Sequence, residues 1–253
     1  VKLSGLGDST VGRRPNLYDI NGDAGHVLAL FFENDYIRGA ESNLVGEILR
    51  EENIKIDLQS RDTALESTFE MIDSLFYNTS HVKAIGIGVP GVVKGDGSIF
   101  NIPNITEWEG INLKSIIENR YHVPAFIEND VNLTTIGVFN RDLKRKYSNI
   151  VYMYFGKGVG SGIIINKRLY KGISNFAGEI GYMIMKDVDP KLLHQLKTKG
   201  LTEQITSDII KDFTDDKALQ MKKLIKEIAH VIINITCILN PEEIGRASCR
   251  ERV

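Results

Sequence analysis

The chain has 253 residues and a formal net charge of -2, with 42% hydrophobic and 25% charged residues, which is the balance of a folded globular protein. Basic and acidic residues are mixed, so no global positive field would hold nucleic acid, and any DNA contact would come from a local patch or another segment. Charged and polar residues interrupt the longest apolar run, Ile225 to Leu239, and neither a membrane span nor a signal peptide is predicted. Two isolated cysteines, Cys237 and Cys249, fit the reducing cytoplasm, where we expect the protein to reside.

Residues 1–22 are rich in Gly, Ser and Arg and show no periodicity before Leu17, which predicts an arm or linker. Four apolar residues then recur at three- and four-residue intervals and predict a helix: Leu65, Phe69, Ile72 and Phe76. Apolar runs bounded by turn residues predict strands at 27–32, 36–42, 54–59, 82–89 and 124–128. A further helix is predicted at 113–121, which gives a first α/β lobe over 23–131.

The pattern then restarts, which predicts a second α/β lobe over 132–244. Strands are predicted at 150–155, 161–166 and 168–170, and helices at 132–141, 202–213 and 218–239. Duplicated α/β units place a ligand cleft between two lobes. After Ile244 the residues 245–253 lose all periodicity, and we interpret them as a non-native tail in place of an expected strand.

Two segments of the first lobe contain candidate ligand-binding groups. Val89-Pro90-Gly91 follows a buried strand, and it is either a plain tight turn or a place where a ligand approaches glycine closely. Downstream, Asn101, Asn104 and Trp108 offer amides and a flat apolar face, a mixture that suits a sugar. A lone Trp is more often part of a core than a binding platform.

A polar triplet, Glu128-Asn129-Asp130, ends a predicted strand, where α/β sheets tend to place ligand-binding groups. A carboxylate there can accept a hydrogen bond from a sugar hydroxyl, and in an enzyme it could act as a general base. The alternative is a helix cap by Asn129 or Asp130, and both roles could coexist.

The second lobe contains a glycine cluster and a glycine-flanked acidic residue. Gly156, Gly158, Gly160 and Gly162 could present backbone amides to a phosphate, but a glycine-rich hairpin equally allows close strand packing, which we favour. Glu179 lies between Gly178 and Ile180-Gly181, and a buried Glu is unfavourable unless it has a partner. Together with Glu203 it forms the second half of a predicted polar pocket.

The assembled motifs resemble the ROK family of sugar kinases and sugar-responsive repressors over nearly all of residues 23–244. The matching segments, in the family's order, are GIGVPGVVKGDG, IPNITEW, PAFIENDVN, YFGKGVGSGIIINKRLYKG and NFAGEIGY. The resemblance implies a two-lobed, actin-like and hexokinase-like α/β ATPase fold, here C-terminally truncated. It also implies sugar binding by Asn104, Asn129, Asp130, Glu179 and Glu203, with Asp130 at the position of the kinases' catalytic base.

Three departures from the family pattern argue against a kinase. The phosphate-binding turn usually reads like Asp-Ile-Gly-Gly-Thr, whereas Phe31 to Asp35 reads FFEND, and Glu33 would repel the phosphates of ATP. The family's structural zinc uses a His and a cysteine-rich run, whereas Tyr182 replaces the His and residues 183–201 contain no cysteine. The glycine-rich strand that helps bind nucleotide is also expected to be missing at the C-terminus. We therefore expect neither ATP nor zinc as a cofactor.

The segment from Gly5 to Tyr18, with Arg13 and Arg14, resembles the connection between a winged helix-turn-helix and the sugar domain of ROK repressors. This resemblance implies the sugar-sensing body of a dimeric repressor whose operator contacts lie in a DNA-binding domain missing from this chain. The two arginines could touch phosphate, although a solvated linker is the simpler interpretation. An ATP-dependent hexose kinase using Asp130, or a remnant without binding activity, are the alternatives.

Overall fold

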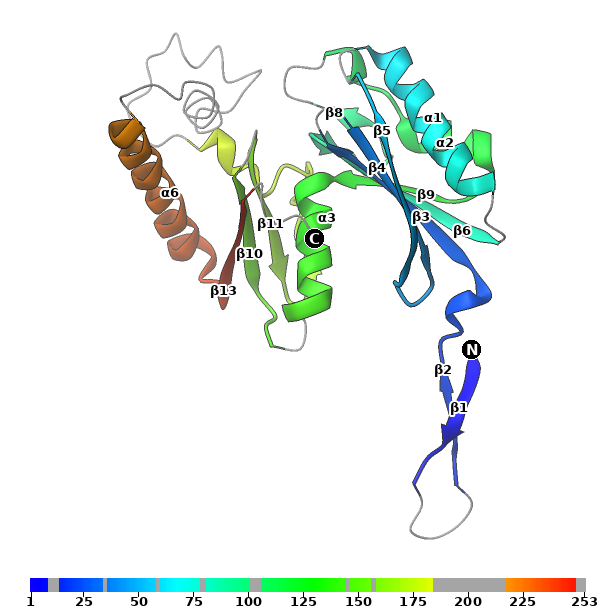
Figure 1. Cartoon of the computed structure of the whole chain (residues 1–253). Coiled ribbons are helices and arrows are strands. Elements are labelled where there is room, and N and C mark those ends of the chain that lie inside the picture. The colour runs from blue at the N-terminus through cyan, green and yellow to red at the C-terminus, as the bar shows by residue number, and fades with distance from the viewer. Residues whose placement is uncertain are drawn as a thin grey trace. The chain divides into compact units, whose positions relative to one another are not determined.

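The computed structural model describes residues 1–8, 14–33, 36–57, 60–77, 81–100, 106–143, 146–155, 158–183 and 217–248. The chain divides into two compact units, shown in Figure 1. Unit 1 contains Val1–Val89, Asp96–Ser98 and Gly110–Glu128, and unit 2 contains Pro90–Gly95, Ile99–Glu109 and Asn129–Val253. The chain therefore passes from unit 1 to unit 2 directly after Val89, after Ser98 and after Glu128.

Unit 1 is built on a five-stranded mixed sheet in the order β5-β4-β3-β6-β9. Its strands are β3 (His26–Glu33), β4 (Tyr36–Asn43), β5 (Ile48–Lys55), β6 (Val82–Val89) and β9 (Ala125–Asn129). β3, β4 and β5 form an antiparallel meander, and β6 runs parallel to β3. The continuous apolar sequences of β3 and β6 fit this central position, because Leu28, Ile85 and Ile87 are fully buried.

Helices α1 (Arg61–Tyr77) and α2 (Leu113–Tyr121) pack beside each other on this sheet (Figure 1). Met71 of α1 occupies the space that a side chain on Gly39 of β4 would need, so glycine at this position allows the close approach. The two helices are joined by Tyr121, whose hydroxyl donates to Asp73 over 2.7 Å and whose ring stacks on Phe76.

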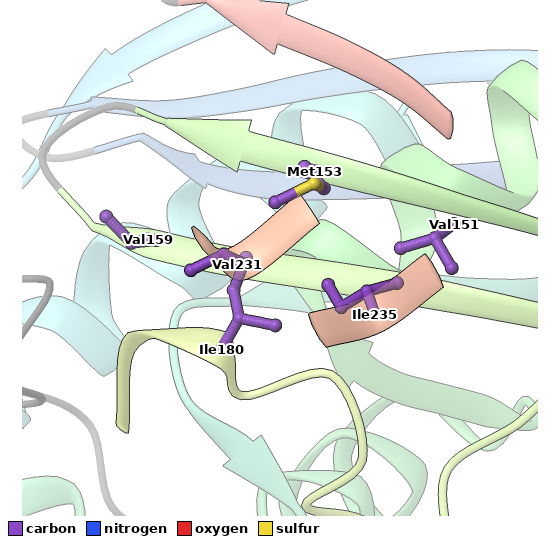
Figure 2. Packing of buried hydrophobic residues seen from close by; sticks show 6 residues of the cluster. All are labelled: Val151, Met153, Val159, Ile180, Val231 and Ile235. Carbon is purple, nitrogen blue, oxygen red and sulfur yellow. The ribbon is translucent and has the colours of Figure 1, made fainter. Parts of the chain in front are cut away.

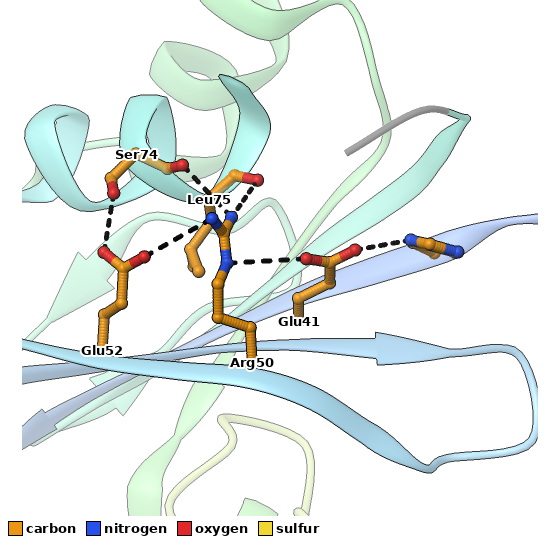
Figure 3. A network of polar contacts seen from close by, with 6 residues as sticks. Glu41, Arg50, Glu52, Ser74 and Leu75 are labelled. Atoms are coloured by element: carbon orange, nitrogen blue, oxygen red, sulfur yellow. Dashed lines mark hydrogen bonds and ion pairs between the residues drawn. The ribbon is translucent and has the colours of Figure 1, made fainter. Parts of the chain in front are cut away.

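A polar network fixes the edge strand β5 to the end of α1 (Figure 3). The Arg50 guanidinium donates to the Leu75 carbonyl over 2.6 Å and lies 3.6 Å from both Glu41 and Glu52. Glu41 in turn lies 2.6 Å from Nδ1 of His26. Because these inward groups are charged, β5 lacks an apolar alternation, and the predicted strand at 54–59 was placed too late in the chain.

The N-terminal arm also differs from the sequence prediction. Strands β1 (Lys2–Leu6) and β2 (Asn16–Asp19) form an antiparallel hairpin with Leu3 opposite Tyr18. Nearly all residues of these two strands are exposed, so no burial pattern marks them in the sequence. The missing periodicity therefore failed to predict this hairpin, while the interpretation of residues 1–22 as an arm or linker stays a prediction.

Unit 2 contains a four-stranded sheet in the order β12-β11-β10-β13. Its strands are β10 (Ile150–Phe155), β11 (Val159–Ile165), β12 (Arg168–Leu169) and β13 (Glu243–Ser248). The last strand pairs in parallel with β10 over its whole length. The prediction that regular structure ends after Ile244 was therefore wrong, since the ladder continues through Ser248.

Helices cover both faces of the unit 2 sheet (Figure 1). On one face α6 (Lys217–Leu239) packs through Val231 and Ile235 onto Val151 and Met153 of β10 (Figure 2). On the other face lie α3 (Asp130–Val138) and a π-helical turn, Phe139–Leu143, whose Phe139 packs with Ile150 and Ile164. Odd- and even-numbered residues of β10 therefore enter two different cores.

Smaller elements complete unit 2. Strands β7 (Val92–Val93) and β8 (Ile99–Phe100) form a short antiparallel hairpin, and short 3-10 turns cover Thr106–Trp108 and Ile180–Tyr182. A third turn of this kind, Gly22–Ala24, precedes β3 in unit 1. None of the helices that the structure describes is long and apolar enough to cross a bilayer. The predicted helix at 202–213 lies outside the described residues.

Candidate functional site

The first predicted site residue, Asn129, is the N-cap of α3. Its Oδ1 accepts a hydrogen bond from the backbone N–H of Asn132 over 2.9 Å, as expected for a capping asparagine. Its Nδ2 donates to the carbonyl oxygen of Gly91 over 2.9 Å. Both polar atoms of this side chain therefore have a protein partner, and the capping role weighed for this residue is confirmed.

Asp130 occupies the first position of α3 and is only partly exposed. Its Oδ1 accepts from the backbone N–H of Val131 over 2.8 Å. Burial raises the pKa of the Asp130 carboxyl from 3.8 to about 6, and backbone hydrogen bonds oppose this rise only in part. A carboxyl group with a pKa in this range can exchange a proton near neutral pH, a property found at functional sites.

Glu179 lies in a turn that is held to β11. The carbonyl oxygen of Gly178 accepts from the backbone N–H of Ser161 over 2.8 Å and from its hydroxyl over 2.9 Å. Gly178 has a φ of +97°, and a Cβ there would collide with the Ser161 carbonyl, so only glycine fits. Directly after Glu179, Ile180 enters the core packed by α6. The backbone of Glu179 is thus fixed on both sides.

β11 links the two acidic residues. A Cβ on Gly160 would lie 3.3 Å from Cγ2 of Val131, which follows Asp130. The next residue, Ser161, holds Gly178, which precedes Glu179. Val131 and Gly178, which adjoin Asp130 and Glu179 in the sequence, thus contact consecutive residues of β11, so both segments lie against the same strand of unit 2.

Two glycines of the glycine cluster, Gly160 and Gly162, serve close packing between β11 and α3. Thr135 of α3 fills the space that a Cβ on Gly162 would need, and Gly160 lies close to Val131. These contacts support the packing interpretation for Gly160 and Gly162, because a larger residue would push α3 away from β11. Gly158 is described in a bend before β11, and Gly156 lies outside the described residues.

The other predicted site residues lie either in a core or outside the described part of the chain. Trp108 is 1% exposed, so it belongs to a core and offers no binding platform. Asn104 and Glu203 lie outside the described residues. Sequence reasoning missed Ser161 and Asn175, whose partners are backbone carbonyls and whose roles leave no motif in the sequence.

The strand end that corresponds to the family's phosphate turn is part of a hairpin. Phe31 pairs with Arg38 and Glu33 pairs with Tyr36, while Phe32 is 3% exposed in the core of unit 1. Residues 34–35 lie outside the described part. In unit 2, Tyr182, which replaces the family's zinc-binding His, packs its ring 5.3 Å from that of Phe176. Among the described residues, no group of three or more His, Cys, Asp or Glu is placed to hold a metal ion.

The mixed sheets with their helical layers place the chain in the hexokinase-like class of α/β proteins. A ROK family regulator homologous to the E. coli MLC protein superposes with a TM-score of 0.75 at 19% identity, covering 92% of this chain and 68% of that one. A ROK family glucokinase from Streptomyces griseus, solved with glucose and AMPPNP, gives a TM-score of 0.68 at 16% identity, covering 88% and 83%. The ROK family model matches residues 34–194, more than half of the chain, which therefore belongs to the ROK family.

Curated relatives include both repressors and kinases. A xylose repressor of Caldicellulosiruptor bescii is 35% identical over 72% of this chain and 47% of the repressor. The xylose repressor of Bacillus subtilis is 32% identical over 90% of this chain and 60% of the repressor. A glucokinase of Streptomyces coelicolor is 33% identical over 50% of this chain and 39% of the kinase. The chain thus spans about half the length of the relatives it matches.

Proposed function

We propose that this chain is the sugar-sensing body of a ROK family transcriptional repressor of carbohydrate-utilisation genes. The observation that carries the proposal is that the segments bearing Asp130 and Glu179 lie against the same strand, because Val131 and Gly178 contact consecutive residues of β11. Two carboxylate residues on well-anchored backbone suit a ligand rich in hydroxyl groups, because each carboxylate accepts hydrogen bonds from hydroxyls. The similarity to xylose repressors supports a monosaccharide or a derivative as this ligand.

Regulation would follow from thermodynamic linkage between a sugar-binding site and an operator-binding site. A sugar that binds one arrangement of the two units better than another shifts the population toward that arrangement. In a dimer, such a shift changes the spacing of the two DNA-binding domains and hence the affinity for a two-part operator.

We propose that the chain is not a kinase, and the end of β3 supports this. Phe31 stands where the family has its Asp, and Glu33 places a carboxylate where the family has glycine amides, just before the hairpin turn. Like charges at this position would disfavour the phosphates of ATP. We expect no turnover when ATP and D-glucose, D-xylose or N-acetylglucosamine are supplied in a coupled assay.

The second candidate, an ATP-dependent hexose kinase, is favoured by one observation. The pKa of Asp130 is raised to about 6, which suits a general base that activates a sugar hydroxyl. The similarity to glucokinases points the same way. Turnover in the coupled assay that is lost in Asp130→Asn would establish the kinase and refute the repressor proposal.

Calorimetric titration and thermal unfolding with the same sugars test the sensor directly. A sugar at 100 times its Kd should stabilise the folded chain by about 2.7 kcal/mol. Glu179→Gln should abolish this gain, because an amide offers fewer acceptor sites than a carboxylate. Glu107→Gln is a matched control, since Glu107 is an exposed carboxylate of the same unit and should leave binding unchanged. No stabilisation of the unaltered chain by any of these sugars would contradict the proposal.

A further inference from the structure

Two asparagine side chains hold the short strand β7 within unit 2. Nδ2 of Asn129 donates to the carbonyl oxygen of Gly91 over 2.9 Å, just before β7 begins. Nδ2 of Asn175 donates to the carbonyl oxygen of Val93 over 2.8 Å, at the last residue of β7. The two donors come from segments far apart in the sequence, and each lies close to a predicted sugar-binding carboxylate: Asn129 precedes Asp130, and Asn175 lies four residues before Glu179.

The turn that contains Asn175 is a closed structure. The backbone N–H of Ala177 donates to the carbonyl of Lys171 over 3.1 Å, and that of Glu179 donates to Phe176 over 3.4 Å. Asn175 itself has a φ of +59°, in the left-handed region that asparagine tolerates better than most residues. The turn therefore carries the Asn175 amide toward β7 and the Glu179 backbone toward β11.

We propose that Asn175 is a positioning residue of the sugar site, which ties the turn bearing Glu179 to β7 and thereby to the Asn129–Asp130 corner. The inference rests on the proposed sugar-binding function and deepens it. Val93 is 3% exposed, so the hydrogen bond from Asn175 ends on a buried strand and not on a mobile loop. Asn175 acts through the backbone and does not touch the sugar.

Asparagine is suited to this position for two separate reasons. Its backbone accepts the left-handed conformation, and its amide supplies an N–H donor to a carbonyl that has lone pairs to spare. Asn175→Gly keeps the first property and removes the second. Asn175→Asp keeps the shape but turns the donor into a carboxylate that faces a carbonyl oxygen.

The test is sugar affinity of the full chain, measured by calorimetry with D-xylose, D-glucose and N-acetylglucosamine. Both variants should raise the Kd of the sugar that binds by about fivefold or more, the effect of one lost hydrogen bond. Asn166→Asp is the matched control, because Asn166 also has a left-handed backbone, at φ +51°, in the β11–β12 turn of the same unit. Its Kd should stay within about twofold of the unaltered chain.

A pH series gives a readout that a merely structural role would not move. A protonated carboxylic acid can donate to Val93, so the ratio of the Asn175→Asp Kd to that of the unaltered chain should fall toward one between pH 7 and about pH 4.5. The ratio for Asn175→Gly should stay constant over this range. This contrast would identify the donor, and not the shape of the turn, as the essential property.

The outcomes separate the two proposals. Sugar binding by the unaltered chain that is equal in Asn175→Asp and Asn175→Gly would overturn the positioning role and leave the sensor function intact. A Kd ratio that does not change with pH in Asn175→Asp would also overturn it. If the unaltered chain binds none of the three sugars, the sensor function fails and the positioning role falls with it.

Discussion

The side chain of Thr135 occupies the space beside Gly162 that any Cβ on that residue would need. Thr135 is fully buried, and its hydroxyl donates to the Val131 carbonyl over 2.7 Å. Helix α3, which begins at Asp130, can therefore lie this close to β11 only because residue 162 has no side chain. The position of the Asp130 carboxylate thus depends on a glycine that we interpret as a packing residue.

Gly162→Ala should destabilise the chain by about 1–3 kcal/mol, since the added methyl group overpacks a filled contact. Gly137→Ala is the control, because Gly137 lies in α3, which packs on β11, and has nothing within 4 Å of its added Cβ. It should stabilise the chain by about 0.5–1 kcal/mol through helix propensity. Urea unfolding compares the two, and equal effects would contradict this account.

Asp130→Asn should stabilise the chain at pH 7 while it weakens sugar binding. The pKa of Asp130 is raised from 3.8 to about 6, so between these values the folded chain holds a proton that the unfolded chain releases. Stability therefore falls as the pH rises through this range, by on the order of 3 kcal/mol in total. The amide removes the ionisation and keeps an acceptor for the Val131 N–H.

Urea unfolding at several pH values tests this expectation. The gain from Asp130→Asn should be largest above pH 6 and vanish below about pH 4. Asp23→Asn, at an exposed carboxylate of unit 1, should change stability by less than about 0.5 kcal/mol at any pH. If the gain in stability from Asp130→Asn does not depend on pH, the buried charge of Asp130 is not the cause of that gain.

Arg50→Met should destabilise the chain by about 3 kcal/mol. It leaves Glu41, whose side chain is 9% exposed, without its guanidinium partner and removes the donor to the Leu75 carbonyl. Arg38→Met is the control, because the Arg38–Glu51 pair on the same sheet is 38% and 42% exposed and should contribute less than about 1 kcal/mol. Similar losses in denaturant unfolding would contradict a special role for Arg50.

Asn129→Asp should destabilise unit 2 although it keeps a capping oxygen for Asn132. The new carboxylate would face the Gly91 carbonyl in place of a donor, and we expect a loss of about 1–2 kcal/mol. Asn112 caps α2 through Ser115 in the same way, and Asn112→Asp should be neutral or slightly stabilising because a negative charge suits a helix N-terminus. Equal effects of the two changes in thermal unfolding would rule out the Gly91 bond as the cause.

The elements that the sequence predicts best are those with one or both faces buried. Strands β6 and β10 and helix α2 were predicted at their observed bounds, because their apolar runs are marked by turns or caps. Edge strand β5 was displaced because Arg50 and Glu52 replace apolar inward groups. Strand β13, with Gly245 in its ladder, owes its form to pairing with β10, a tertiary contact that local propensity does not contain.

The site was predictable only where a strand end coincides with a helix start. Asn129 and Asp130 satisfy that rule, and a carboxylate at such a corner has a recognisable position in the chain. The groups that bind the side chains of this corner have no recognisable position in the sequence. The Gly91 and Val93 carbonyls are backbone groups, and any residue type would supply them, so only the folded chain identifies Asn129 and Asn175 as their donors.

The burial of strand β10 on both faces limits which residues its sequence can tolerate. Val151 and Met153 enter the core under α6, while Ile150 enters the core beside the π-helical turn, so successive residues are enclosed on opposite faces. In a library that randomises one position at a time, almost every polar replacement in β10 should be eliminated by selection for folded protein. The exposed residues of β1 and β2 should tolerate most replacements in the same selection. Mutational tolerance along the chain would then trace the two-faced layer of unit 2 independently of any ligand.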